Sequence, residues 1–201
     1  MAQPPPRASG LEELREAAAS CQACDLWREA TQTVFGEGAE HAKLMLIGEQ
    51  PGDQEDIQGH PFVGPAGQLL DRALEQAGID RGRVYVTNAV KHFRWVRRGK
   101  RRLHEKPNAQ QIRACRPWLE AEVETVKPQL LVLLGATAAQ SVMGPDFRVS
   151  KQRGEVLPSP LGIPAVATVH PSSILRAIDE ASRREAMESL VADLKVAAGQ
   201  R

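Results

Sequence analysis

The sequence predicts an α/β fold: a three-layer α/β/α sandwich around a central, mainly parallel sheet of four strands. Short apolar segments alternate along the chain with longer segments whose apolar residues recur at helical spacing, which is typical of a parallel sheet covered by helices on both faces. The 201 residues, 42% of them hydrophobic, suffice for one substantial core. We therefore expect a flexible, Pro-rich segment over residues 1–10 and a single domain over residues 11–201.

The first half of the chain contains two predicted helices and two predicted strands. Residues 11–19 carry apolar side chains on one helical face, and residues 43–47 form a short apolar strand that stops at a glycine. Residues 66–77 form an amphipathic helix, which Gly78 ends. Residues 84–90 are again a short apolar run, and we predict that they form the second strand.

The second half of the chain continues the alternation. The Asn-x-x-Gln capping box at its start predicts a helix over residues 108–126. Residues 129–134 form a continuous apolar strand, as expected where helices cover both faces of a sheet, and residues 136–143 form the next helix. Residues 164–169 are the fourth strand. Residues 180–198 are the last helix, because their apolar side chains form one stripe.

The composition excludes several classes of protein. No uninterrupted apolar run approaches the roughly 20 residues that a bilayer requires, and the polar start of the chain lacks the apolar stretch of a secretory signal. Three cysteines are too few for a disulfide scaffold, so a metal or redox role competes with plain burial of the thiols. We therefore expect a cytoplasmic monomer that makes no contact with membranes.

The charges are distributed unevenly. Residues 91–106 contain eight Lys or Arg and a single acidic residue, so this segment has a net charge of +7 and the rest of the chain −6. A basic segment on an acidic body favours contact with phosphates, and Phe93 and Trp95 within it are candidates for base stacking. The alternative is a solvated surface loop. We place an inserted basic loop at about residues 93–106.

Polar and glycine-rich motifs follow all four predicted strands. They are residues 48–53 after the first strand, Asn88 near the end of the second, residues 135–137 after the third and residues 170–173 after the fourth. Ligands of open parallel sheets bind outside the carboxyl ends of the strands, so these motifs are expected to meet at one site. No G-x-G-x-x-G, G-x-x-x-x-G-K-[ST] or G-x-S-x-G motif is present, which argues against dinucleotide binding, P-loop chemistry and a hydrolase nucleophile elbow.

Four segments of the chain carry a family resemblance. They are GEQPGDQED (48–56), PFVGPAG (61–67), VYVTNAVK (84–91) and HPSS (170–173). In this combination and order they resemble the uracil-DNA glycosylase superfamily, in particular its iron-sulfur-containing family 4 branch. The resemblance extends over about residues 21–194.

Two departures from the family 4 pattern indicate a subgroup. His92 stands where family 4 has a Cys after the Asn-bearing strand, and the following loop carries the insertion KRRLH at residues 100–104. Both features are similar to those of the UdgX-type subgroup, whose members attach covalently to the site from which they remove uracil.

The resemblance implies an activity on DNA. It implies that the protein excises uracil from single-stranded as well as double-stranded DNA, releases uracil, and becomes attached through His104 to C1′ of the abasic site in a single turnover. One alternative is a conventional multiple-turnover family 4-type uracil-DNA glycosylase, in which His104 only touches phosphate. A further alternative is a non-enzymatic nucleic-acid-binding module.

The resemblance also assigns a pocket for the flipped base. By resemblance Phe62 is the stacking platform, Asn88 reads the uracil edge, and His170 donates to uracil O2 as negative charge grows on the leaving base. An Asn amide can donate to O4 and accept from N3–H, an arrangement that cytosine does not match. Alternatively, Phe62 is a core residue, Asn88 satisfies loop backbone groups and His170 caps a helix. Further substrate-binding residues are expected to be Gly48, Gly52 and Asp53.

The chemistry at the sugar is assigned to Glu49, Gln50 and His104. Glu49 would stabilise positive charge on the sugar or on a protonated His, and Gln50 would hold a water or an imidazole by hydrogen bonds. A neutral His104 imidazole held close to C1′ has a large proximity advantage over bulk water as the nucleophile. The residues expected to contact DNA are Lys91, Arg94, Lys100, Arg101, Arg102, Ser172 and Ser173.

A metal site is indicated by Cys21, Cys24 and Cys115, a C-x-x-C pair with a distant third thiol. This set is one ligand short of the usual four for an iron-sulfur cluster, and His92 would complete it. On spacing alone, a structural Cys₃His zinc site is an alternative, as are free thiols beside a surface His. The family resemblance favours a 4Fe-4S cluster with a structural role.

Overall fold

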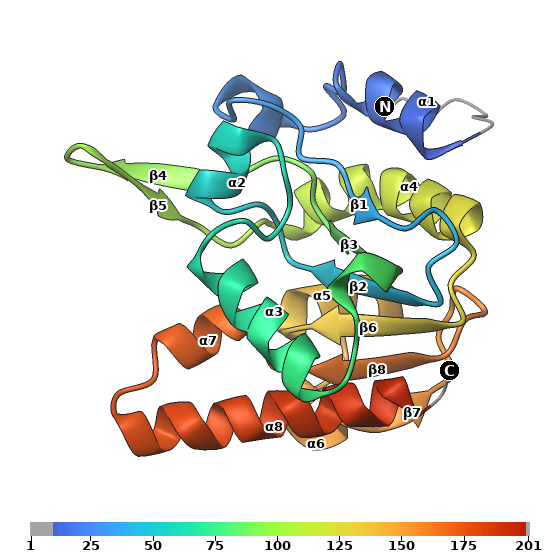
Figure 1. The fold of residues 1–201 in the computed structure, drawn as a ribbon. Coiled ribbons are helices and arrows are strands. Elements are labelled where there is room, and N and C mark those ends of the chain that lie inside the picture. Colours follow the sequence, from blue (N-terminus) through green and yellow to red (C-terminus); the bar gives the residue numbers. More distant parts are fainter. Residues whose placement is uncertain (1–9, 200–201) are drawn as a thin grey trace.

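The computed structural model describes residues 10–199, and its centre is a sheet with the strand order β1-β3-β2-β6-β8-β7 (Figure 1). The four inner strands run parallel and confirm the predicted strands. They are β3 (Val84–Asn88), β2 (Leu44–Gly48), β6 (Leu130–Leu134) and β8 (Ala165–Thr168).

The sheet has six strands and not the predicted four. The additional strands are β1 (Glu37–Gly38) and β7 (Val156–Leu157), which pair antiparallel with the outer parallel strands β3 and β8. Each is two residues long, too short to carry a recognisable pattern of alternating apolar side chains. The mainly parallel α/β architecture is therefore confirmed with short antiparallel edges.

The predicted helices are confirmed as the long helices α1, α3, α4, α5 and α8, with ends that differ by at most one residue. Short helices that the sequence analysis did not predict lie between them. In chain order the helical elements are α1 (Leu11–Ala18), the 3₁₀ helix η1 (Asp25–Arg28), α2 (Asp53–Gln58), α3 (Pro65–Gln76), the 3₁₀ helix η2 (Arg81–Arg83), α4 (Ala109–Val126), α5 (Ala136–Met143), α6 (Val149–Gln152), α7 (Pro171–Leu175) and α8 (Glu180–Ala198).

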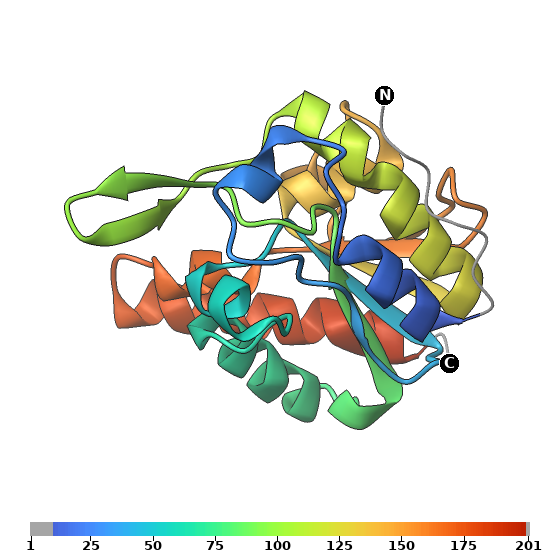
Figure 2. The same cartoon turned by 90° about the horizontal axis from the view of Figure 1, so that it is seen from above.

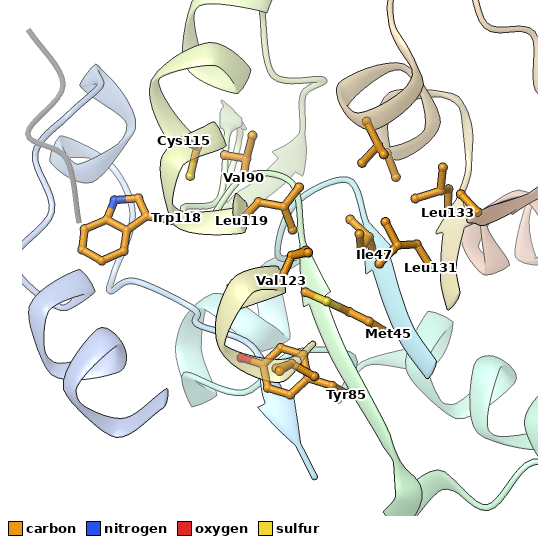
Figure 3. Close-up of a cluster of buried hydrophobic side chains, with 14 of the residues drawn as sticks. Met45, Ile47, Tyr85, Val90, Cys115, Trp118, Leu119, Val123, Leu131 and Leu133 are labelled. Atoms are coloured by element: carbon orange, nitrogen blue, oxygen red, sulfur yellow. The ribbon is translucent and has the colours of Figure 1, made fainter. Parts of the chain in front are cut away.

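Two apolar layers enclose the sheet and confirm the sandwich. Along β2, Met45 and Ile47 face the layer that contains α1, α4 and α5, whereas Leu44 and Leu46 face the layer that contains α3, α7 and α8. Figure 3 shows the first of these layers, where Leu119 and Val123 of α4 lie over the sheet and Trp118 points toward the N-terminal segment. Because both faces of the inner strands are buried, the strands are mostly apolar, and their polar residues, Thr87, Asn88 and Thr168, lie toward their carboxyl ends.

The inserted basic segment forms a β-hairpin, which corrects the expectation of a loop. Its strands are β4 (Trp95–Arg98) and β5 (Arg101–His104), and the hairpin projects away from the body in both views (Figures 1 and 2). Gly99 at the turn has φ +62°, a conformation that glycine adopts without steric cost, and it allows a two-residue connection. The arginines in both strands hide the alternation that would otherwise predict them.

Within residues 10–199, no helix is both long enough and apolar enough to cross a bilayer. The flexible segment predicted over residues 1–10 lies, except for Gly10, outside the described residues.

Candidate functional site

The carboxyl ends of the parallel strands border a cavity of about 750 Å³. Gly48 and Asn88 pair in register as the last residues of β2 and β3, and the loops after β6 and β8 form the opposite wall. The structure thus brings together most of the predicted site, and the predicted residues that line the cavity are Glu49, Gln50, Gly52, Phe62, Asn88, His104, His170, Ser172 and Ser173.

Phe62 and Asn88 lie side by side because Gly48 has no side chain. A Cβ at Gly48 would lie 2.7 Å from Cζ of Phe62 and would also collide with Oδ1 of Asn88. Phe62 has φ +58°, a strained backbone conformation for a non-glycine residue of the kind that occurs at ligand sites. The result is an aromatic ring beside a buried carboxamide at one end of the cavity.

His170 presents an N–H group to the cavity. Its Nδ1 accepts a hydrogen bond from the backbone N–H of Ser172 at 3.1 Å, so in the neutral ring the proton is on Nε2. Burial lowers the pKa of His170 to about 4, against the attraction of the Glu49 carboxylate, and the ring is neutral at physiological pH. It stacks at 26° to the ring of Phe62, with centroids 6.3 Å apart. The His170 side chain also caps the N-terminus of α7. The predicted capping role is therefore confirmed, and it is compatible with the proposed role in the cavity.

Glu49 lies between two side chains that reach it from distant parts of the chain. Its Oε1 is 3.1 Å from Nε2 of His104, and its Oε2 accepts a hydrogen bond from Thr137. Burial raises the pKa of Glu49, but these two partners outweigh it, and the pKa lies below its ordinary value. The cavity therefore holds a carboxylate beside an imidazole. Thr137 belongs to the motif after β6, but sequence reasoning gave it no role.

Gln50 holds the base of the hairpin. Its Nε2 donates to the carbonyl oxygens of Arg94, at 3.1 Å, and Glu105, at 3.0 Å, while its Oε1 accepts from the Arg94 backbone N–H at 3.1 Å. Both N–H donors of the amide are thereby used. This corrects the expectation that Gln50 holds a water or an imidazole: the amide joins the two ends of the hairpin that carries His104.

Arg102 ties the hairpin to α2. Its guanidinium forms ion pairs with Asp53 and Asp56, both at 2.6 Å, and lies 5.5 Å from the ring centroid of Phe93. Asp56 is fully buried. These contacts correct two expectations, because Asp53 faces an arginine instead of the substrate pocket, and Arg102 faces two carboxylates instead of phosphate.

The remaining predicted DNA contacts divide into exposed and internal residues. Lys100 and Arg101 are exposed at the tip of the hairpin, and Ser172 and Ser173 line the cavity. Arg94 is half-buried and pairs with Glu105, whose side chain is 44% exposed, at 2.8 Å.

Lys91 is an internal residue with only 1% of its surface exposed, and its ammonium pairs with the buried Glu122 of α4. The expectation that Lys91 contacts DNA is therefore wrong. A charge count along the sequence does not distinguish a buried lysine from its exposed neighbours.

Lys106 and Arg176 also line the cavity and were not predicted to belong to the site. Lys106 belongs to the basic segment, but neither residue lies in one of the recognised motifs.

Of the predicted metal ligands, Cys115 lies in the first half of α4, and Cys21 contacts the same helix. Cys115 is buried, which raises the pKa of its thiol to about 12, and Cys21 and Cys24 lie near enough for their charges to raise it further. Cys21 accepts a hydrogen bond from Trp118 Nε1 at 3.1 Å, and Cys115 accepts one from the Lys91 backbone N–H at 3.2 Å. Such N–H bonds are typical around metal-bound sulfur.

His92 has the protonation that a metal ligand needs. The hydroxyl of Thr33 donates to the Ala18 carbonyl oxygen at 2.9 Å, so its oxygen accepts from Nε2–H of His92 at 3.0 Å and Nδ1 keeps its lone pair. The residue types therefore fit a Cys₃His site. As placed, however, the side chains of residues 10–199 include no group of three or more His, Cys, Asp or Glu arranged around a common metal position.

The fold and the site define an α/β protein with a ligand cavity at the carboxyl edge of a parallel sheet. Residues 35–195 match the family described as the uracil DNA glycosylase superfamily. The chain belongs to this superfamily.

Three curated relatives are similar over most of their length. A type-4 uracil-DNA glycosylase of Thermotoga maritima is 36% identical over 181 residues, which cover 90% of this chain and 91% of the relative. One of Sulfurisphaera tokodaii is 35% identical, covering 81% and 77%, and one of Pyrobaculum aerophilum is 34% identical, covering 83% and 85%.

Replacing Arg102 by Gln should lower the free energy of unfolding by roughly 1–3 kcal/mol, because the buried Asp56 carboxylate loses its charged partner. Arg116→Gln is the matched control, since its pair with Glu120 is exposed and contributes about 0.5 kcal/mol or less. Urea denaturation of both variants measures the difference. Equal stabilities would mean that the ion pairs of Arg102 do not hold the hairpin against α2.

Proposed function

We propose that this protein removes uracil from DNA by cleaving its N-glycosidic bond. The observation that carries the proposal is the cavity in which Phe62, Asn88, Glu49 and an N–H group of His170 surround one space. The similarity to type-4 uracil-DNA glycosylases at about 35% identity supports it. Such an enzyme must turn the target nucleotide out of the base stack, and this cavity is large enough for a base with its sugar.

Recognition of uracil falls to Phe62 and Asn88. The Phe62 ring offers an apolar face on which the flipped base stacks, and the Asn88 amide donates to O4 and accepts from N3–H. Cytosine presents an amino group and an unprotonated nitrogen at these two positions, so its pattern of donors and acceptors is opposed. This pairing gives the specificity for uracil.

Bond cleavage depends on His170 and Glu49. As the bond between C1′ and N1 breaks, its electron pair moves onto the base, and Nε2–H of His170 donates to O2, where negative charge develops. The Glu49 carboxylate stabilises the positive charge that develops on the sugar. Both groups have the required protonation at physiological pH.

The finer proposal is that His104 captures C1′, as in the UdgX-type subgroup. Glu49 holds one nitrogen of the imidazole, and in the neutral ring the other nitrogen keeps a lone pair. That lone pair forms a bond to C1′ as the bond to uracil breaks, and Glu49 stabilises the resulting imidazolium. The carbon–nitrogen bond leaves the protein attached to the abasic site.

A second candidate is conventional turnover, which the names of the relatives favour. In this case Glu49 orients a water molecule toward C1′, and His104, whose side chain is 50% exposed, contacts only the DNA backbone. The two candidates share the recognition of uracil and the roles of Phe62, Asn88 and His170. They differ in the atom that forms a bond to C1′, which is a nitrogen of His104 in the first candidate and a water oxygen in the second.

DNA contact is assigned to the exposed basic tip of the hairpin and to the serines after His170. Lys100 and Arg101 would bind phosphates beside the target nucleotide, and Ser172 and Ser173 would bind them at the other side of the cavity. Neither contact requires a complementary strand. We therefore propose that single-stranded as well as double-stranded DNA is bound.

For the cofactor we propose a 4Fe-4S cluster held by Cys21, Cys24, His92 and Cys115. The residue types, the N–H bonds to Cys21 and Cys115 and the lone pair on Nδ1 of His92 support this assignment, and a structural zinc ion is the alternative. The cluster would have a structural role, since its ligands join α4 to the segments that precede β1 and the hairpin.

The covalent step can be tested with equimolar protein and a uracil-containing oligonucleotide. The unmodified protein should give a one-to-one complex that survives heat and detergent on a denaturing gel. His104→Ser should abolish the complex and release uracil over many turnovers, because water then reaches C1′. His41→Ser, which changes an exposed His that precedes β2, at the opposite end of that strand from the cavity, is the control and should still form the complex. Many turnovers by the unmodified protein would support the conventional candidate.

Replacing His170 by Ala should slow uracil release by about 10²- to 10³-fold, the usual effect of removing one oxyanion donor. Because burial lowers the pKa of His170 to about 4, against Glu49 and with Arg176, its neutral donor form persists to low pH. Protonation of Nδ1 would break the bond from the Ser172 backbone N–H that orients the ring, so in the His104→Ser background the rate should show no half-loss near pH 6.5, the ordinary pKa of an imidazole. Half-loss of the rate near pH 6.5 would contradict a neutral, buried His170.

Purified protein should contain iron and absorb broadly in the visible range. Cys24→Ala should lose the iron and part of the thermal stability together, because metal binding contributes to folding free energy. Elemental analysis and thermal denaturation measure both quantities. Zinc in place of iron, without visible absorption, would support the alternative metal.

A further inference from the structure

Lys91 and Glu122 form a charged pair inside the protein that the proposed reaction does not use. Their side chains are 1% and 0% exposed, and the ammonium contacts Glu122 Oε2 directly. Burying two charges costs several kcal/mol of desolvation per ion, which a pair rarely recovers as net stability. Packing alone does not require charges here, since apolar side chains of similar volume fill such a space. The arrangement of their hydrogen bonds indicates a different use.

The ammonium of Lys91 has three partners for its three donors. They are Glu122 Oε2, Oγ1 of Thr87 at 2.6 Å and the backbone carbonyl oxygen of Asn88 at 2.8 Å. Asn88 is the last residue of β3, at the point where its side chain enters the cavity. The lysine therefore holds the backbone of the residue to which uracil recognition is assigned.

Glu122 anchors this arrangement from α4. Its Oε1 accepts from the Gly36 backbone N–H at 3.0 Å, the Tyr85 hydroxyl at 3.0 Å and Thr87 Oγ1 at 2.9 Å. Thr87 and Tyr85 both belong to β3. One carboxylate thus fixes β3 at two side chains and, through Lys91, at its end.

We propose that Lys91 and Glu122 are positioning residues for uracil recognition, which set the place and direction of the Asn88 amide from behind the sheet. The inference rests on the proposed function, in that Asn88 reads the uracil edge. A displacement of a recognition group by about 1 Å costs on the order of 10²-fold in rate. Loss of the Lys91 donor should allow such a displacement, because Asn88 is buried and water is a poor replacement for the lost donor there.

The test compares Glu122→Gln with the double variant Lys91→Met, Glu122→Gln. Both variants lack the Glu122 carboxylate. They differ in the Lys91 nitrogen, because Glu122→Gln keeps the hydrogen bond from Lys91 to the Asn88 carbonyl oxygen and the double variant loses it. Each single change, Lys91→Met or Glu122→Gln, leaves one buried charge unpaired and lowers stability. Thermal denaturation is therefore measured for every variant, and the rates are compared at a temperature at which all of them are folded. Visible absorption and iron content are measured for each protein, because Lys91 directly precedes His92 and its own backbone N–H donates to Cys115 Sγ at 3.2 Å.

The readout is the single-turnover rate of uracil release, measured at increasing protein concentration so that the limiting rate and the half-saturating concentration separate. The double variant should lose about 10- to 100-fold in limiting rate relative to Glu122→Gln, while half-saturation changes by less than about threefold. Val123→Ala, a core change on the same helix, is the stability control and should lower the melting temperature without a comparable loss of rate.

Equal limiting rates for Glu122→Gln and the double variant would overturn the inference, as would an equal loss in Val123→Ala, which would indicate general loosening of the core. If the unmodified protein releases no uracil from DNA, the proposed function fails and this inference fails with it. Normal uracil release by the unmodified protein together with an unaffected double variant would reject the positioning role alone.

Discussion

The site depends on the hydrogen bonds of two consecutive residues, Glu49 and Gln50, directly after β2. Gln50 joins the two ends of the basic hairpin through three hydrogen bonds to its backbone, and Glu49 meets His104 at the end of that hairpin. A hairpin outside the main sheet has little packing of its own, and two isolated strands are marginally stable in water. The Gln50 side-chain amide supplies hydrogen bonds that a neighbouring strand would otherwise supply, and it thereby fixes the position of the His104 imidazole.

The surroundings of the cavity follow the same principle of fixing mobile groups by buried polar contacts. Arg102 connects the hairpin to α2 through two carboxylates, and Glu122 with Lys91 fixes the end of β3. The sheet supplies the rigid base, because its inner strands are buried on both faces. In the proposed reaction, recognition and cleavage can therefore rely on groups that are held in place before DNA binds, which is how preorganised sites lower reaction barriers.

The inner strands and the long helices could be predicted from the sequence because apolar periodicity reports burial directly. The meeting of Asn88 and His170 at one cavity follows from the same pattern, since parallel strands place their carboxyl ends together. The direction of a charged side chain has no such signature. Lys91 belongs to a run of basic residues, but its ammonium points inward and pairs with Glu122. Gln50 binds the backbone of a hairpin, and the arginines in that hairpin mask the alternating pattern that would have predicted its strands. The two-residue strands β1 and β7 are too short for any pattern.

Hydrogen exchange of backbone amides in Gln50→Ala measures directly whether the Gln50 amide holds the hairpin in place. The Arg94 N–H donates to Gln50 Oε1, and the Glu105 N–H closes the hairpin at the Arg94 carbonyl, at 3.0 Å. The backbone amides of residues 94–105 should exchange at least about tenfold faster in the variant, while those of β2, β3 and β6 are unchanged. Unchanged exchange across the hairpin would contradict this role of Gln50.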